Sequence, residues 1–164
     1  IYKNNKFLNR IFVAKDYEFV SNNDSILNKI INKNFDPVNL SFINKNDLNL
    51  NQINQLTLLK NNVKTKIDLI SWESDEIKFK VNTESPQLIV LSEIFHPGWI
   101  INDDKIKIFR INGIFRGIIV PSGEKEIVME YKPSDIIIGG WISLVSYVFL
   151  ISIFLYNVYR RKSV

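Results

Sequence analysis

The sequence of 164 residues contains 21 Lys and Arg, 17 Asp and Glu, one His and no Cys, and its net charge is +4 at pH 7. The absence of cysteine excludes disulfides and thiolate metal sites. Arg160, Arg161 and Lys162 supply three positive charges, and the remaining basic residues are almost balanced by the acidic residues of 1–135. A nucleic-acid-binding domain needs a clustered basic face, so no nucleic-acid partner is expected.

The beginning of the chain does not resemble a signal peptide. Residues 1–10 lack a charged start followed by an apolar run and a small-residue cleavage site. The chain also begins at Ile1 and not at Met. We therefore expect it to be the C-terminal part of a longer protein whose earlier membrane spans precede it. Two short β-like segments follow, at residues 10–14 and 17–20.

One short helix is predicted over about residues 25–33. Asp24 or Ser25 can cap its N-terminus. The helix is indicated by an apolar stripe at helical spacing, formed by Ile26, Leu27, Ile30 and Ile31. Asp36-Pro37 ends this unit, because the residue before a proline avoids the α conformation.

The next segments are predicted to be a strand at Val38–Ile43 and then a loop. Residues 44–55 are rich in Asn and weakly patterned, which favours the loop. From Val63 onward the pattern is that of β structure. Alternating apolar and polar residues indicate half-buried strands at 77–82, 105–110 and 126–131, and the continuous apolar run 88–91 indicates a central strand.

The spacing of these strands predicts the fold class. Strands recur at intervals of about 8–12 residues, as in β-sandwiches, and a further strand is expected at 115–120. In the strand at 105–110, Ile106, Ile108 and Arg110 are predicted to share one face, with Phe109 on the other. Residues 1–135 are therefore expected to form a mainly β, sandwich-like domain with one short helix.

Residues 136–159 are predicted to form a single C-terminal transmembrane helix. These 24 residues carry no charge, and about 20 apolar residues suffice to cross a bilayer. Trp141 at one end and Tyr156 and Tyr159 at the other fit the aromatic belts of membrane interfaces. Basic residues in 160–164 predict a cytoplasmic tail by the positive-inside rule. Residues 1–135 are then expected to be extracytoplasmic, with the lipid bilayer as partner of the helix.

Three ordered stretches resemble the C-terminal region of the YfhO-like family of bacterial polytopic membrane proteins. Residues 91–99 are similar to its Leu-Ser-Glu, aromatic pair, Pro-Gly-Trp segment. Residues 112–123 are similar to its hairpin of Asn, small residue, aromatic, Arg and Val-Pro-x-Gly. Residues 128–133 are similar to the Tyr-x-Pro segment that leads into the last span. His96 departs from the usual aromatic residue, and the turn at 102–105 departs from the usual Asp-Gly.

The resemblance implies a multi-pass membrane protein related to the GT-C glycosyltransferases. Such enzymes use a polyprenyl-phosphate sugar at the outer face of the cytoplasmic membrane, and their catalytic acidic residues are expected upstream of this chain. The chain would then be a non-catalytic accessory domain and the last span, reaching envelope glycan or lipid-linked sugar through the full-length protein. No cofactor is expected. Two alternatives remain open: a structural or interaction module, and a membrane-anchored carbohydrate-binding domain.

Five residues in the family-like stretches are candidates for glycan or anion contact. Trp99 can stack on a sugar, although an aromatic anchoring a strand is the more ordinary role. Arg116 can bind a phosphate or acidic glycan, although an ion pair or an outward-facing charge is more common. The complete set is Phe95, His96, Trp99, Phe115 and Arg116.

No catalytic or metal site is predicted from the remaining polar residues. His96 has no His or Cys partner for a metal site. Asp103-Asp104 could coordinate a cation, but adjacent carboxylates in a polar turn are usually solvated. Glu93 lies among apolar residues and could be a buried acid, yet acid–base catalysis cannot be argued from a single carboxylate.

Overall fold

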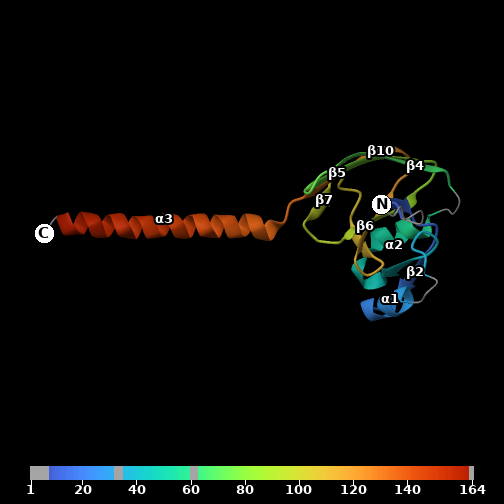
Figure 1. The fold of residues 1–164 in the computed structure, drawn as a ribbon, viewed down its shortest axis with the longest axis horizontal. Helices are drawn as coiled ribbons and strands as arrows, with labels where there is room; N and C mark the ends of the chain where they lie inside the picture. Colours follow the sequence, from blue (N-terminus) through green and yellow to red (C-terminus); the bar gives the residue numbers. More distant parts are fainter. Residues whose placement is uncertain (1–7, 32–34, 60–62, 163–164) are drawn as a thin grey trace, which may run out of the picture. The chain divides into compact units, whose positions relative to one another are not determined.

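Two four-stranded antiparallel sheets make up most of the β domain, as the computed structural model shows for the described residues 8–31, 35–59 and 63–162 (Figure 1). The first sheet has the order β1 (Ile11–Val13), β6 (Gln87–Ile94), β9 (Phe115–Val120) and β8 (Phe109–Ile111). The second has the order β4 (Thr65–Trp72), β5 (Glu76–Thr83), β10 (Gly123–Tyr131) and β7 (Trp99–Ile101). The prediction of a mainly β, sandwich-like fold is confirmed.

The main core lies between the inner faces of these two sheets. Alternate residues of each strand point to one face, and the apolar set of each strand meets the set of the other sheet. The buried members of this core are Ile11, Ile77, Phe79, Val81, Ile89, Leu91, Ile101, Ile106, Ile118, Val120, Ile127 and Met129. Apolar residues alternate with polar ones in the strand that ends at Tyr131 because Ile127 and Met129 face this core.

The outer face of the first sheet is buried as well. Leu88 and Val90 belong to a second core, together with Phe109, Ile111 and Ile119. Both faces of β6 are thus covered, which explains the continuous apolar run that predicted a central strand. The second core also receives Leu56, which is 1% exposed and comes from helix α2 (Leu50–Thr57).

The prediction of a loop over residues 44–55 is wrong. The segment contains a short 3₁₀ helix η1 (Lys45–Asp47) and then α2. Asn49 caps α2 by accepting from the Gln52 backbone N–H, while the Gln52 side chain accepts from the Asn49 N–H. This reciprocal capping box starts the helix, and its signal is hard to distinguish in a segment where Asn is abundant throughout.

The short helix predicted near residue 25 exists, but its bounds differ. Helix α1 runs from Asn23 to Ile30, and Asn22 caps it by accepting from the Ser25 N–H. Residues 32 and 33 of the predicted helix lie outside the described residues. Ile26 is buried whereas Leu27 and Ile31 are exposed, so the face that packs is narrower than the predicted stripe.

A small parallel sheet joins α1 to the sandwich. It pairs β2 (Tyr17–Val20) with β3 (Ser41–Asn44). The strand predicted at Val38–Ile43 begins later, because the Asp36 carboxylate accepts from the Val38 N–H and holds the preceding residues in a turn.

The strand predicted at 105–110 is also wrong in extent and in facing. Asp103 closes a tight turn, in which its carboxylate accepts from Lys105 N–H and its carbonyl accepts from Ile106 N–H. Only Phe109–Ile111 pair as β8, and Phe109 is 2% exposed. Phe109 therefore faces the second core, not the solvent with the lysines.

Gly117 is required by the close approach of a neighbouring strand. Phe109 lies opposite Gly117 in the register of β8 and β9, and a Cβ at Gly117 would lie 2.8 Å from Phe109 Cε2. We predict that Gly117→Ala lowers the free energy of unfolding by about 1–3 kcal/mol through overpacking. Denaturant unfolding of the full chain in detergent checks this. Gly140→Ala, which would meet no atom within 4 Å, is the control; equal stability of both variants would contradict the prediction.

The chain divides into two compact units, Ile1–Tyr131 and Lys132–Val164. The second unit contains helix α3 (Ser134–Lys162), within which Ser134–Asn157 is long and apolar enough to cross a membrane. This confirms the prediction of a long apolar C-terminal helix. Its polar side chains are partly satisfied within the helix, since Ser146, Ser152 and Asn157 donate to the carbonyls of Ile142, Val148 and Ile153.

Candidate functional site

Two of the five predicted contact residues, Phe95 and His96, lie in the tight connection between β6 and β7, and a third, Trp99, is the first residue of β7. The backbone N–H of Trp99 donates to the His96 carbonyl, and the Gly98 N–H donates to His96 Nδ1. The His96 imidazole thus stabilises the turn 96–99 in which it lies. Phe95 N–H donates to the carbonyl of Ile114, which ties this connection to the turn between β8 and β9.

Trp99 and Arg116 meet across the end of the sandwich. Arg116 Cζ lies 4.0 Å from the centroid of the Trp99 ring, so the guanidinium covers one face of the indole. Trp99 comes from the second sheet and Arg116 from the first. Along β9, Arg116 lies on the same face as the inward-facing Ile118 and Val120. The pair therefore bridges the two sheets at one end of the main core.

Arg116 is buried, in contrast to the ion pair or outward charge that the sequence favoured. Its exposed fraction is 5%, and its Nε donates to the Ile94 carbonyl over 2.9 Å. Its Nη1 is buried without a hydrogen-bond partner, and no carboxylate of the described residues lies within 4 Å of the guanidinium. Burial lowers the pKa of Arg116, and the Glu93 carboxylate opposes this effect. The cation is held mainly by the indole face and one carbonyl.

Tyr131 completes this group of rings and was absent from the predicted contact residues. Its ring centroid lies 5.3 Å from His96 and 5.4 Å from Trp99. Tyr131 stands opposite Trp99 in the register of β7 and β10. The alternation of Ile127, Met129 and Tyr131 already placed Tyr131 on the inner face, and this signal could have identified it.

Phe95 and Phe115 have different surroundings from that group. Arg110 Cζ lies 5.3 Å from the Phe95 ring centroid, so a second arginine–aromatic pair stands beside the turn. Phe115 packs against the second core, on the opposite face of β9 from Arg116. The structure thus places His96 and Trp99 beside Tyr131, and Arg116 joins this group through its contact with Trp99. Phe115 is not part of this cluster.

The cluster of His96, Trp99, Arg116 and Tyr131 is suited to holding the two sheets together through aromatic and cation–π contacts. The described residues contain no group of His, Cys, Asp or Glu able to hold a metal ion. Glu93, the candidate acid, is half-buried and acts on Arg116 through its charge. Because Arg116 occupies one face of Trp99, a sugar ring cannot stack on that face.

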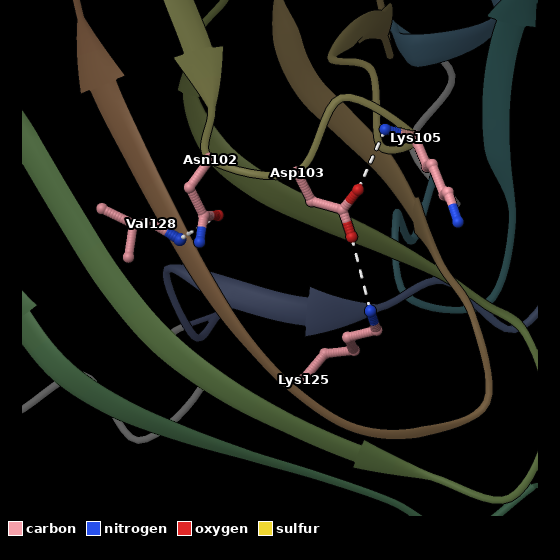
Figure 2. A network of polar contacts seen from close by, with 5 residues as sticks. All are labelled: Asn102, Asp103, Lys105, Lys125 and Val128. Atoms are coloured by element: carbon pink, nitrogen blue, oxygen red, sulfur yellow. Dashed lines mark hydrogen bonds and ion pairs between the residues drawn. The ribbon is translucent and has the colours of Figure 1, made fainter.

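Asp103, the other candidate metal ligand, belongs to a polar network at the end of β7 (Figure 2). Its carboxylate accepts from the Lys105 N–H over 2.9 Å and lies 3.4 Å from Lys125 Nζ. Asn102 beside it accepts from the Val128 N–H, which extends the pairing of β7 with β10. The Lys105 N–H first, and then Lys125, lower the pKa of Asp103.

This network predicts a pH dependence of stability. A carboxyl whose pKa is lowered by folding stabilises the protein above its unfolded pKa of about 3.9, and this contribution is lost as the pH falls through the lower folded value. We expect the stability difference between wild type and Asp103→Asn to be largest near neutral pH and to shrink below pH ~4. Denaturant unfolding at several pH values measures it.

The control for this prediction is Lys125→Gln, which removes the ion pair but retains the Lys105 N–H. Because the Lys105 N–H is the larger cause of the pKa shift, this variant should keep most of the acid-dependent loss of stability. A difference between wild type and Asp103→Asn that stayed constant with pH would contradict the prediction.

Comparisons with known proteins identify no relative of this chain: no family model, curated protein or solved structure matches it. Membership of the YfhO-like family is therefore a proposal.

Proposed function

We propose that this chain is the extracytoplasmic accessory domain and last membrane span of a YfhO-like multi-pass protein of the bacterial cell membrane. The full-length protein would transfer sugar from a polyprenyl-phosphate donor to a cell-envelope polysaccharide, and this part would be non-catalytic. The observation that carries the proposal is a folded β domain joined by two residues, Lys132 and Pro133, to a helix that is long enough to span a bilayer and is uncharged over residues 136–159.

The properties of α3 support its assignment to lipid. Its large apolar side chains are exposed along the whole candidate span, including Trp141 at 65%, Phe149 at 64% and Leu155 at 59%. A helix with such a surface needs lipid or other helices around it. Arg160 follows the span, and basic residues there favour the cytoplasmic side. This charge supports an extracytoplasmic position for the β domain.

The geometry of Trp99 favours a bracing role over sugar stacking within this proposal. One indole face is covered by Arg116 and Tyr131 lies beside the ring, so the family-like residues join the two sheets. This also supports the second candidate function, a structural or interaction module with no glycan role. A membrane-anchored carbohydrate-binding domain would need an open aromatic face elsewhere.

The first test is topology in cells. Because the chain has no cysteine, one introduced cysteine reports its own side of the membrane. We predict that Leu58→Cys, at a site 65% exposed, reacts with a membrane-impermeant maleimide in intact cells. Ser163→Cys should react only after permeabilisation. The reverse labelling pattern would contradict the proposed orientation.

The second test concerns the proposed glycosyltransferase. The upstream reading frame should encode further spans and acidic residues in the first outer loop. Removing the β domain from the full-length protein should reduce envelope glycosylation while the remaining spans still insert. Unchanged glycosylation would leave the structural module as the better description.

A further inference from the structure

The end of the β domain from which the chain leaves for α3 is fixed by covalent distance. Tyr131 is the last residue of β10 and Ser134 the first of α3. Three extended residues span at most about 11 Å. If α3 crosses the membrane, as proposed above, residues that contact Tyr131 must lie close to the headgroup region, which is about 5–8 Å thick on each side of the hydrocarbon.

Exposed apolar side chains gather at this same end. The His96 ring contacts Tyr131. On either side of His96 in the sequence, Phe95 is half-buried and Pro97 is exposed. Ile94, just before them, is 70% exposed. The Phe95 N–H donates to the Ile114 carbonyl, which brings Ile114 to the same end of the domain. The Ile114 side chain is 57% exposed. We call Ile94, Phe95, Pro97 and Ile114 the apolar tip.

We propose that the apolar tip docks on the lipid headgroup–acyl boundary of the outer leaflet. This inference rests on the proposed membrane span and adds a second membrane contact to it. Apolar side chains gain free energy by leaving water for this boundary. Trp99 and Tyr131 next to the tip are the residue types that prefer it. The contact would hold the β domain against the membrane surface.

The charged residues at this end of the domain indicate whether docking depends on the charge of the lipid headgroups. Arg110 stacks on Phe95, and Arg10 lies 4.9 Å from the Trp72 ring centroid. The turn between β4 and β5 brings the exposed acids Glu73 and Asp75 to the same end, because the Tyr131 N–H donates to the Asp75 carbonyl. With both signs present, attraction to anionic lipid is weak. Docking should therefore depend on the apolar tip and change little between zwitterionic and anionic vesicles.

The experiment places an environment-sensitive fluorophore on single cysteines of the full chain, reconstituted in phosphatidylcholine vesicles. Ile94→Cys and Ile114→Cys report the tip. Leu58→Cys is the matched control, since it is similarly exposed but lines a pocket with Pro121. Pro121 precedes β10, whose length separates it from Tyr131 by about 25 Å. Val145→Cys in α3 reports the span itself.

We expect the fluorophores at the tip to shift to shorter emission wavelengths and to be quenched by nitroxides near the headgroup, while the Leu58 fluorophore stays in water. Deep nitroxides should quench the Val145 label. Quenching at Val145 without quenching at the tip would overturn the docking inference but leave the span intact. No quenching at Val145 would overturn both. If the emission of the tip fluorophores shifts without nitroxide quenching, the tip is covered by protein, such as a second copy, and not by lipid. If the Leu58 fluorophore is quenched as strongly as the tip fluorophores, the domain adsorbs to the vesicle without a preferred face. Either result contradicts docking.

Discussion

Replacing Asn112 by alanine should lower the free energy of unfolding by about 2–4 kcal/mol. Asn112 has a φ of 50°, is 3% exposed and sits in the turn between β8 and β9. Its Oδ1 accepts from the Phe42 N–H over 2.7 Å, and its Nδ2 donates to Ser41 Oγ. Alanine would be strained at this φ and would leave the buried Phe42 N–H unpaired.

Asn112→Gly separates the two causes, because glycine adopts positive φ without strain but cannot accept the hydrogen bond. We expect it to recover about 1 kcal/mol relative to alanine. Denaturant unfolding of the full chain in detergent, followed by circular dichroism, measures both variants. Equal stability of Asn112→Ala and wild type would show that the side-chain link to β3 contributes little.

Replacing Trp99 by alanine should lower stability by about 3 kcal/mol, at the lower end of values for buried Trp because the ring is half-buried. The loss has two parts: contacts with the main core, and the aromatic face that covers the buried guanidinium of Arg116. Without that face the cation would remain buried with a single carbonyl partner, which is costly. Thermal or denaturant unfolding gives the total.

A double-mutant cycle isolates the contact between Trp99 and Arg116. Trp99→Ala, Arg116→Met and the double variant should give a coupling energy of about 2 kcal/mol, as for a desolvated cation–π pair. The matched control is Trp72 with Arg10, whose arginine is exposed and lies 4.9 Å from the ring centroid. That pair should give about 0.5–1 kcal/mol. Similar coupling energies for both pairs would contradict a special role for burial at Arg116.

The parts of the fold that could be predicted are those where one pattern dominates locally. Strands 17–20 and 115–120 were predicted with the bounds that the structure shows, because β-branched and aromatic residues leave few alternatives there. Helix α2 was missed because its capping box is made of Asn and Gln in an Asn-rich segment. Phe109 was assigned to the wrong face because the turn at Asp103 changes the register, which alternation alone cannot reveal.

The candidate site could be predicted only as a set of residue types near turns. His96 and Trp99 are candidates because they lie in a family-like stretch around a Pro-Gly turn, and the structure places them beside Tyr131. The burial of Arg116 depends on Trp99 of the other sheet, a contact between distant strands. A charged residue within a strand is usually exposed, so no local pattern indicates this burial.

The place of β10 in its sheet has a consequence for biosynthesis. This strand is the last of the domain to be made, yet it lies between β5 and β7 and pairs with both. The β4–β5 hairpin can form early, but β7 has no partner in its sheet until β10 arrives. Chains begin to fold during synthesis, so the second sheet closes only when the residues just before α3 have emerged. Closure of the domain is thereby timed to the synthesis of its apolar helix.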